Sequence, residues 1–206
     1  MKFYKKYVRQ FIPTSRIRSV TEISRDMELK RQFARLRPGI VLDAGSRDSP
    51  YKRFIPHTKY LRLDIDKSSE PDICCDLHDI DWEADYFDTV IITEVLEHLY
   101  DPQKAIDNIH RVLKPNGVCI LSTRFMFPYH PDPKDYYRFT QDSLSYLFRN
   151  FRRAEIHHHG NRVQVMWQTI NIGKVNAFLN VLNPLFARIM SKNTNFPSGF
   201  IVYAEK

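Results

Sequence analysis

Residues 87–123 read FDTVIITEVLEHLYDPQKAIDNIHRVLKPNGVCILST, and this stretch decides the fold. It begins with an almost wholly apolar run at 89–93, as expected of a strand that is buried on both faces of a sheet. A helical pattern follows at 101–113, with Asp101 as its N-cap. A second apolar run at 118–123 comes after a Pro-Asn-Gly turn. A strand, a helix and a strand of these lengths predict two parallel strands in one sheet.

The same alternation continues on both sides of this stretch. Three short apolar runs precede it, and each carries aspartate near its end: GIVLDAG at 39–45, YLRLDID at 60–66 and DICCD at 72–76. Helices are also expected at 20–36, 140–151 and 174–190, and strands at 152–159 and 199–206. The sequence therefore predicts an α/β protein with a Rossmann-like, doubly wound and mostly parallel seven-stranded sheet, with helices on both faces.

Length and composition indicate how the chain is divided. It has 206 residues, of which 43% are hydrophobic, and this is enough for one well-packed core. We expect a basic N-terminal arm with a leading helix at 1–37, and a single domain at 38–206 with a helical insertion at about 170–192 before the last strand.

A pair of cysteines and a run of three histidines resemble metal or disulfide sites, and we interpret both as structural. The three cysteines have no paired spacing, so neither a disulfide framework nor a zinc site is indicated. We expect Cys74 and Cys75 to be buried in strand packing. Alternate residues of a strand point to opposite faces, so the run from His157 to His159 cannot converge on one metal ion, and we expect it to be exposed to solvent.

Charge is distributed unevenly along the chain. Residues 1–37 carry 11 Lys/Arg and 3 Asp/Glu, a net +8; residues 38–159 carry 15 and 20, a net −5; residues 160–206 carry 5 and 1, a net +4. The basic ends favour contact with an anionic surface or substrate, and a solubilising arm is the alternative. The acidic core argues against binding along a nucleic-acid backbone.

The same segments bear on location. No run approaches the roughly 18 apolar residues of a membrane-spanning helix, and the N-terminus lacks the apolar stretch of a secretory signal, so we expect a cytoplasmic protein. Peripheral contact with the inner face of the membrane, through the basic termini, is the alternative. The amphipathic stretch at 174–190 has three interpretations: a lid over the acceptor, a dimer surface or an interfacial membrane helix. We expect packing against the core before any contact with a membrane.

Ligands of open α/β sheets bind beyond the carboxyl ends of the strands, and here these positions are acidic. A carboxylate after the second strand can accept hydrogen bonds from both ribose hydroxyls, and one after the third can accept from an adenine amine. This arrangement suits a cofactor that contains adenosine. The residues at the strand ends are Asp43 and Gly45, then Asp64, Asp76, Thr93 and Glu94.

The loop after the first strand distinguishes between such cofactors. It reads GSRDSP at 45–50, with one glycine and the acidic Asp48, whereas a dinucleotide site uses GxGxxG to bind pyrophosphate. S-adenosylmethionine has no phosphate and carries a sulfonium and an ammonium cation, so an acidic pocket favours it.

The motifs VLDAGSRDSPY, YLRLDID, CDLHDIDW and PYHPDPKDYYRFT, together with residues 87–123, resemble the class I S-adenosylmethionine-dependent methyltransferases, in the broad family that includes the ubiquinone-type methyltransferases. The resemblance covers about residues 39–150. The segment HPDPKDYYRFT is similar to a subgroup associated with cell-surface glycan and other envelope biosynthesis.

The resemblance implies roles for the strand-end residues. Asp43 and Gly45 would lie by the methionine moiety, Asp64 would bind the ribose, and Asp76 with Leu77 would contact adenine. Thr93 and Glu94 would close the site from the fourth strand.

The glycine loop departs from the family pattern GxGxG. This chain has Gly45, Arg47 and Ser49 at the three positions. Because an arginine does not easily adopt positive φ, we expect the loop to follow a different path or to bind the cofactor more weakly.

Residues after the fourth and fifth strands are expected to reach the acceptor. His98 and His130 are the candidate bases for removing a proton from a hydroxyl, since methyl transfer is otherwise mainly a matter of positioning. Glu94, Glu97 and His98, with His130 as a fourth ligand, resemble the metal site of small-RNA 3′-terminal methyltransferases. We assign no metal, because carboxylates also favour the first turn of a helix. The other acceptor-side residues are Asp135, Tyr136, Tyr137 and Arg138.

The predicted function is transfer of a methyl group from S-adenosylmethionine to a small or lipid/glycan-linked acceptor, at oxygen, with release of S-adenosylhomocysteine. One alternative is a noncatalytic cofactor-binding or scaffold protein with a degenerate glycine loop. Another is a metal-dependent RNA methyltransferase.

Overall fold

The computed structural model describes residues 18–131, 133–170, 183–188 and 195–206. The helices are α2 (Val20–Phe33), α3 (Pro102–Val112), α4 (Gln141–Leu147), α5 (Arg162–Ile170) and α7 (Asn183–Arg188). The strands are β1 (Ile40–Ala44), β2 (Lys59–Asp64), β3 (Ile73–Cys74), β4 (Phe87–Thr93), β5 (Leu113–Arg124), β6 (Arg153–His159) and β7 (Gly199–Glu205). Short 3-10 turns are η2 (Lys52–Phe54), η3 (Lys67–Ser69), η4 (Leu77–Asp79) and η5 (Leu96–His98).

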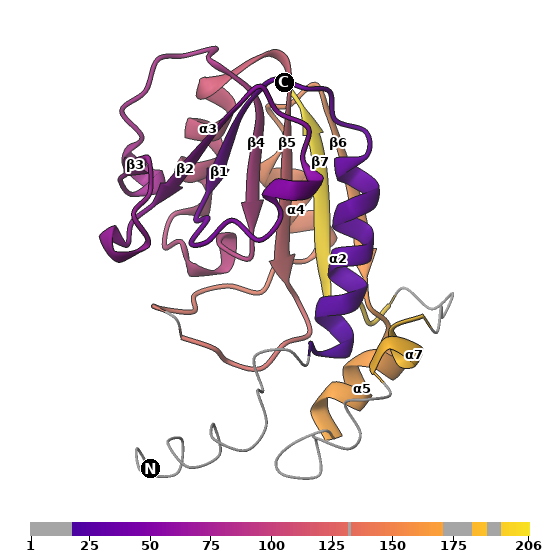
Figure 1. Cartoon of the computed structure of the whole chain (residues 1–206). Coiled ribbons are helices and arrows are strands. Elements are labelled where there is room, and N and C mark those ends of the chain that lie inside the picture. Colours follow the sequence, from indigo (N-terminus) through magenta and orange to yellow (C-terminus); the bar gives the residue numbers. More distant parts are fainter. Residues whose placement is uncertain (1–17, 132, 171–182, 189–194) are drawn as a thin grey trace.

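All seven strands form one sheet in the order β3-β2-β1-β4-β5-β7-β6 (Figure 1). The pairs from β3 to β5 are parallel, and β7 runs antiparallel to both β5 and β6. The mostly parallel seven-stranded sheet is therefore confirmed. The order steps outward from β1 in both directions, which leaves the carboxyl ends of β1 and β4 side by side at the centre.

Helices cover both faces of the sheet, as predicted. Alternate residues of each strand contribute to two separate cores. On one face, Leu29 and Phe33 of α2 pack with strand residues such as Ile91 and Ile120. On the other, α3 packs its apolar stripe against the neighbouring strand positions; its buried residues are Ala105, Ile106, Ile109 and Val112.

The helix starts follow from local chemistry. Ser19 and Glu22 form a capping box at the start of α2, and Asp101 accepts from the backbone N–H of Lys104 at the start of α3. Helix α2 ends at Phe33, three residues before the predicted end, because the N–H groups of Arg35 and Leu36 bond to carbonyls three residues back, which tightens the last turn. The helix predicted at 174–190 lies largely outside the described residues, of which Asn183–Arg188 is helical.

Two interpretations of single residues were wrong. Cys74 is exposed, because β3 is a two-residue strand at the edge of the sheet. His159 is buried, with 2% of its surface exposed, although we expected it to face solvent. It pairs with Gly199 on β7, where a Cβ would come within 2.6 Å of the His159 ring, so the missing side chain makes room for the imidazole.

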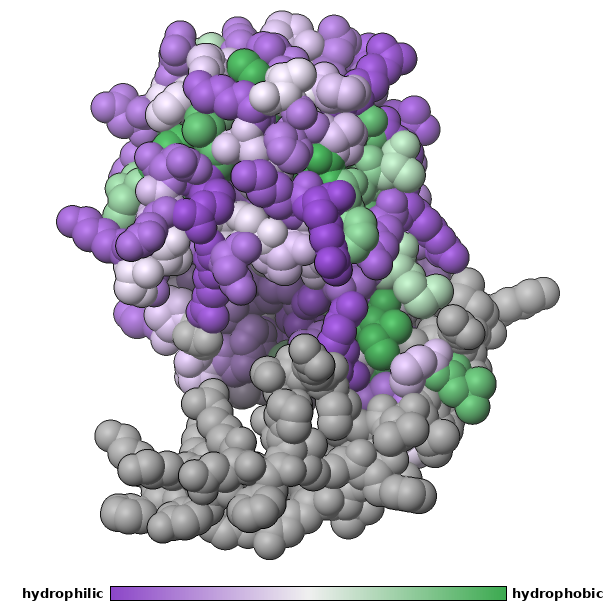
Figure 2. Space-filling model, in the orientation of Figure 1, coloured by the Kyte–Doolittle hydropathy of each residue, from purple (hydrophilic) through white to green (hydrophobic). Residues whose placement is uncertain are grey.

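The surface of the described residues is mostly hydrophilic on the face shown in Figure 2, with hydrophobic residues scattered among polar ones. Within the described ranges, no helix is long and apolar enough to cross a membrane.

Candidate active site

The loops that follow β1, β2, β4 and β5 meet at one end of the sheet, where the predicted site residues are found (Figure 1). Helices α5 and α7 lie toward the same end. The structure therefore brings the strand-end acids and the residues after β5 to one edge.

The glycine loop adopts left-handed backbone at all three positions of the family pattern. The φ angles are 70° at Gly45, 42° at Arg47 and 49° at Ser49. Our expectation that Arg47 would avoid positive φ was wrong. Its backbone N–H donates to Asp64 Oδ2 at 2.9 Å, and the Ser49 N–H donates to the Ser46 carbonyl at 2.7 Å. These bonds offset a strain of about 1–2 kcal/mol per residue, so the loop keeps a glycine-like path.

No residue other than glycine fits at position 45. It combines positive φ with close approach to Val95, whose Cγ2 would collide with any added Cβ. We expect Gly45→Ala to lower the free energy of unfolding by about 2–3 kcal/mol, from backbone strain and overpacking together. Urea denaturation measures this loss. Gly45→Ala combined with Val95→Ala should recover part of it; a double variant no more stable than Gly45→Ala would contradict the steric account.

Asp64 lies where a ribose-binding carboxylate is expected. It accepts from the backbone N–H groups of Arg47 and Asp66, each at 2.9 Å, and it is 6% exposed. These two bonds fix the carboxylate between the loops that follow β1 and β2. An open depression of about 450 Å³ adjoins those loops; its lining residues are Arg47, Asp48, Arg62, Asp66 and Ser69.

The other two acids at this edge differ in how far they are open to a ligand. Asp43 is buried and accepts from the Tyr60 hydroxyl at 2.7 Å, and burial raises its pKa. Asp76 accepts from the backbone N–H of His78 at 2.9 Å, and its side chain is 35% exposed. Leu77, the adjoining residue, is buried. Asp76 thus remains open to a ligand, whereas Asp43 joins β1 to Tyr60 of β2.

Glu94 lies in a cluster with two arginines that the sequence did not reveal. Its Oε2 pairs with Arg25 of α2 at 3.0 Å and with Arg124 at the end of β5, and its Oε1 accepts from the Ser122 hydroxyl at 2.8 Å. Burial alone would raise the pKa of Glu94, but Arg124 and Arg25 outweigh it and lower the pKa, so Glu94 is ionised. Arg25 also pairs with Asp26 at 3.2 Å, so two arginines and two carboxylates meet here.

Arg25 also joins α2 to the loop after β1. It donates to the Tyr51 hydroxyl at 3.0 Å, and that hydroxyl donates to Asp26 at 2.7 Å. A search of strand ends could have found Arg124, which closes β5. Arg25 gives no such signal, because its position depends on how α2 packs on the sheet.

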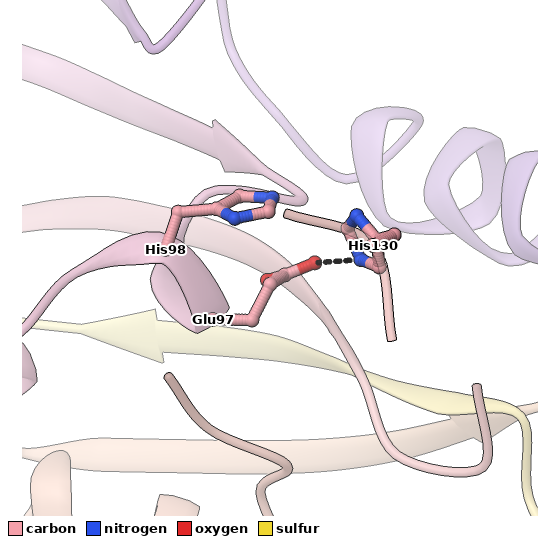
Figure 3. A group of neighbouring side chains, drawn as sticks. All are labelled: Glu97, His98 and His130. Atoms are coloured by element: carbon pink, nitrogen blue, oxygen red, sulfur yellow. Dashed lines mark ion pairs between the residues drawn. The ribbon is translucent and has the colours of Figure 1, made fainter. Parts of the chain in front are cut away.

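Glu97, His98 and His130 converge in a second cluster (Figure 3). Glu97 is fully buried; its Oε2 accepts from the Thr123 hydroxyl at 2.8 Å, and its Oε1 lies 4.0 Å from His130 Nε2. Glu97 Oε1 and His130 Nε2 have no hydrogen-bond partner among the described residues. The two candidate bases are thus brought together, with ring centroids 4.9 Å apart.

The cluster contains three groups that can ligate a cation. One ligand atom from each of Glu97, His98 and His130 lies within 4.8 Å of the others. Glu94, which the metal alternative includes, is paired with Arg25 and Arg124 instead. The structure thus brings together three of the four residues of that alternative.

The buried Glu97 has a consequence for stability. Burial, followed by repulsion from Glu94, raises the pKa of Glu97 well above its ordinary value of 4.5. A carboxyl whose pKa is raised by folding stabilises the fold at low pH and loses that contribution as the pH rises above the ordinary value. We expect Glu97→Gln to raise the melting temperature at pH 8 and to change it little at pH 4.5. Scanning calorimetry at both pH values checks this; an equal shift at both would contradict it.

The model of a methyltransferase domain matches residues 56–121. Ubiquinone biosynthesis O-methyltransferases of Psychrobacter cryohalolentis and Psychrobacter arcticus are each 48% identical over 40 residues, which is 19% of this chain and only 16% of theirs.

Solved structures resemble the whole chain at low identity. A SAM-dependent methyltransferase from Archaeoglobus fulgidus has a TM-score of 0.59 and 14% identity, with 99% of this chain and 100% of that one covered. The 1,6-didemethyltoxoflavin-N1-methyltransferase of Burkholderia thailandensis, with bound 1,6-didemethyltoxoflavin and S-adenosylhomocysteine, has a TM-score of 0.56 and 17% identity, with 100% and 85% covered. These likenesses establish the fold.

The sheet order and the structural likenesses define a class I, Rossmann-like methyltransferase fold. The methyltransferase domain model matches residues within that sheet, from the segment before β2 into β5.

Proposed function

We propose that this protein transfers the methyl group of S-adenosylmethionine to a hydroxyl oxygen of a small or lipid/glycan-linked acceptor. The observation that supports this is the pair of histidines beside buried Glu97, at the same sheet edge as Asp64 and Asp76. A hydroxyl must lose its proton as its oxygen is methylated, so a proton acceptor is needed at this place.

The cofactor site is proposed to use the strand-end residues. Asp64 binds the ribose hydroxyls, and Asp76 with Leu77 contacts adenine. Gly45 and Asp43 lie beside the methionine moiety. Gly45 leaves room for it, and Asp43 is held in place by the Tyr60 hydroxyl.

Thr93 and Glu94 close the cofactor site from the end of β4. Arg25 and Arg124 hold the Glu94 carboxylate in its ionised form at this end of the sheet.

The transfer step is a direct displacement. The bond from acceptor oxygen to the methyl carbon forms while the carbon–sulfur bond breaks, and the sulfonium becomes the neutral sulfur of S-adenosylhomocysteine. The acceptor proton passes to His130, with His98 as the other candidate. Burial lowers the pKa of His130, which keeps its ring neutral and able to accept a proton at neutral pH.

Release of S-adenosylhomocysteine with a panel of hydroxyl compounds tests this proposal. The panel contains sugars, phenols and lipid alcohols, and the matched controls are the corresponding amines. Turnover that depends on a hydroxyl supports the proposal. Methylation of the amines alone, or cofactor binding without turnover on any compound, would favour N-methylation or a scaffold role instead.

A metal-dependent enzyme is the second candidate, because Glu97, His98 and His130 can ligate a divalent cation. Calorimetric titration with Mg²⁺, Mn²⁺ and Zn²⁺ tests it, with Glu97→Gln as the comparison. Saturable binding that is lost in Glu97→Gln, together with restored turnover after chelation and metal return, would support this candidate. Unchanged turnover in EDTA would remove it.

A further inference from the structure

Helix α5 turns polar side chains toward the protein and apolar ones away from it. Gln164 is buried, and the Gln168 side chain pairs with the Thr21 hydroxyl of α2. Val163 and Met166 lie on the outward face and are 42% and 54% exposed. A surface helix of a soluble protein normally has the reverse arrangement, so the outward face of α5 indicates contact with an apolar environment.

Helix α7 also exposes an apolar side chain and is joined to α5. Leu185 is 62% exposed, whereas Asn183 at the start of the helix is buried. The Asn183 side chain accepts from the Trp167 indole N–H at 3.0 Å and donates to the Arg18 carbonyl at 2.9 Å. This single amide therefore holds together α5, α7 and the segment that leads into α2. Both helices lie beyond the carboxyl ends of β4 and β5 (Figure 1).

Two segments of the chain that carry no acidic residue meet at this contact. Residues 1–18 contain six Lys/Arg and residues 160–198 contain four, and neither range contains Asp or Glu. The bond between Asn183 and the Arg18 carbonyl joins the two ranges. Arg18 pairs with Asp26 of α2, but even without Arg18 the two ranges contribute nine positive charges and no negative one. The segments that meet here therefore favour an anionic partner.

Outward aliphatic side chains beside acid-free, basic segments suit the surface of a lipid bilayer. The aliphatic groups enter the boundary between headgroups and acyl chains, and the cations meet anionic headgroups. A single-stranded nucleic acid would also attract the cations, but its bases stack on aromatic side chains rather than on Val, Met or Leu. A second copy of this chain would bring the same positive charges against each other. An anionic bilayer is thus the partner that satisfies both the apolar groups and the charge.

We propose that α5 and α7 attach this protein to the surface of an anionic lipid bilayer. Val163, Met166 and Leu185 enter the headgroup region, and the basic segments lie against the anionic lipids. Each of these two signals alone gives weak, reversible binding, and together they give a stable attachment. The attachment goes beyond the proposed methyl transfer and does not depend on it. Because both helices lie beyond the carboxyl ends of β4 and β5, it holds the candidate active site near the bilayer (Figure 1).

Flotation of the full chain with lipid vesicles tests the proposal without requiring turnover. The probes are vesicles of phosphatidylcholine alone and vesicles of phosphatidylcholine mixed with phosphatidylglycerol. We expect binding to the mixed vesicles that weakens as the salt concentration rises, and much weaker binding to phosphatidylcholine alone. Met166→Asp and Leu185→Asp should each weaken the binding about ten-fold or more. Both side chains are exposed in the free protein, so both variants should fold normally by circular dichroism.

The matched control is Tyr146→Asp, which adds the same negative charge at an equally exposed position (66%) on helix α4 and should leave vesicle binding nearly unchanged. Equal losses in Tyr146→Asp and Leu185→Asp, or no vesicle binding at low salt, would overturn the proposal. Tighter binding to a single-stranded oligouridine than to the mixed vesicles would assign the surface to nucleic acid and overturn it. So would self-association that Leu185→Asp abolishes, if vesicle binding is absent. Vesicle binding by a chain without turnover would support the attachment while the proposed methyl transfer failed.

Discussion

Asp64→Ala should weaken the affinity for S-adenosylmethionine by about 100-fold, which is the expected cost of removing a carboxylate that accepts two ribose hydroxyls. Asp64 already accepts from the Arg47 and Asp66 backbones and is held between two loops. The variant therefore also removes the hydrogen bond that holds the Arg47 turn. The loss of this bond and the loss of the ribose contacts both lower the affinity. Isothermal titration of the purified chain measures the change.

Two further variants separate ligand binding from loop support. Asp64→Asn keeps one acceptor oxygen and should give an intermediate affinity. Asp79→Ala removes an exposed carboxylate that pairs with Lys104, outside the proposed cofactor set, and should bind normally. An Asp64→Ala variant that remains folded by circular dichroism and binds like the unmodified chain would contradict the ribose assignment.

His130→Gln should lower kcat by about 100-fold or more, with the cofactor affinity unchanged. The Nε2 atom of His130 faces Glu97 and its other ring nitrogen points away from that carboxylate (Figure 3). The nitrogen that faces away from Glu97 is the one placed to accept the proton of a hydroxyl. Steady-state kinetics with a hydroxyl acceptor, alongside calorimetry with S-adenosylhomocysteine, measure the two quantities separately.

The pH profile provides a second readout for the same residue. Because burial lowers the pKa of His130, activity should persist below pH 6.5 and fall only as the ring becomes protonated. His57→Gln is the matched control, since the His57 ring contacts the Ile55 carbonyl at 2.7 Å and lies outside the cluster. If His130→Gln and His57→Gln had the same kcat, His130 would not be the base, and His98 would become the candidate.

The fold could be predicted because its signals are local. Apolar runs and helix caps predicted the strand–helix alternation, and residues 87–123 alone indicated two neighbouring parallel strands. The predicted Pro-Asn-Gly turn was wrong, because β5 already begins at Leu113 and runs through these residues. The positions of Asp64 and Asp76 followed from one general rule, that strand ends meet at one edge of such a sheet. The contacts of these residues with the cofactor stay predictions.

The remaining features depend on contacts between distant parts of the chain. Arg25 and Glu94 meet because α2 packs across the sheet, which no spacing between them reveals. Arg47 takes positive φ because Asp64, 17 residues away, accepts its N–H. His159 is buried because its partner on β7 is a glycine. In each case a tertiary contact overrides the local preference of the residue.

The central claim is that this sheet edge binds S-adenosylmethionine despite its single loop glycine. The most direct measurement is calorimetric titration of the full chain with S-adenosylhomocysteine. The left-handed loop and the fixed Asp64 predict binding at one site, with a dissociation constant on the order of 1 μM to 1 mM, and weaker binding in Asp64→Ala. No heat of binding at several millimolar ligand would contradict the account.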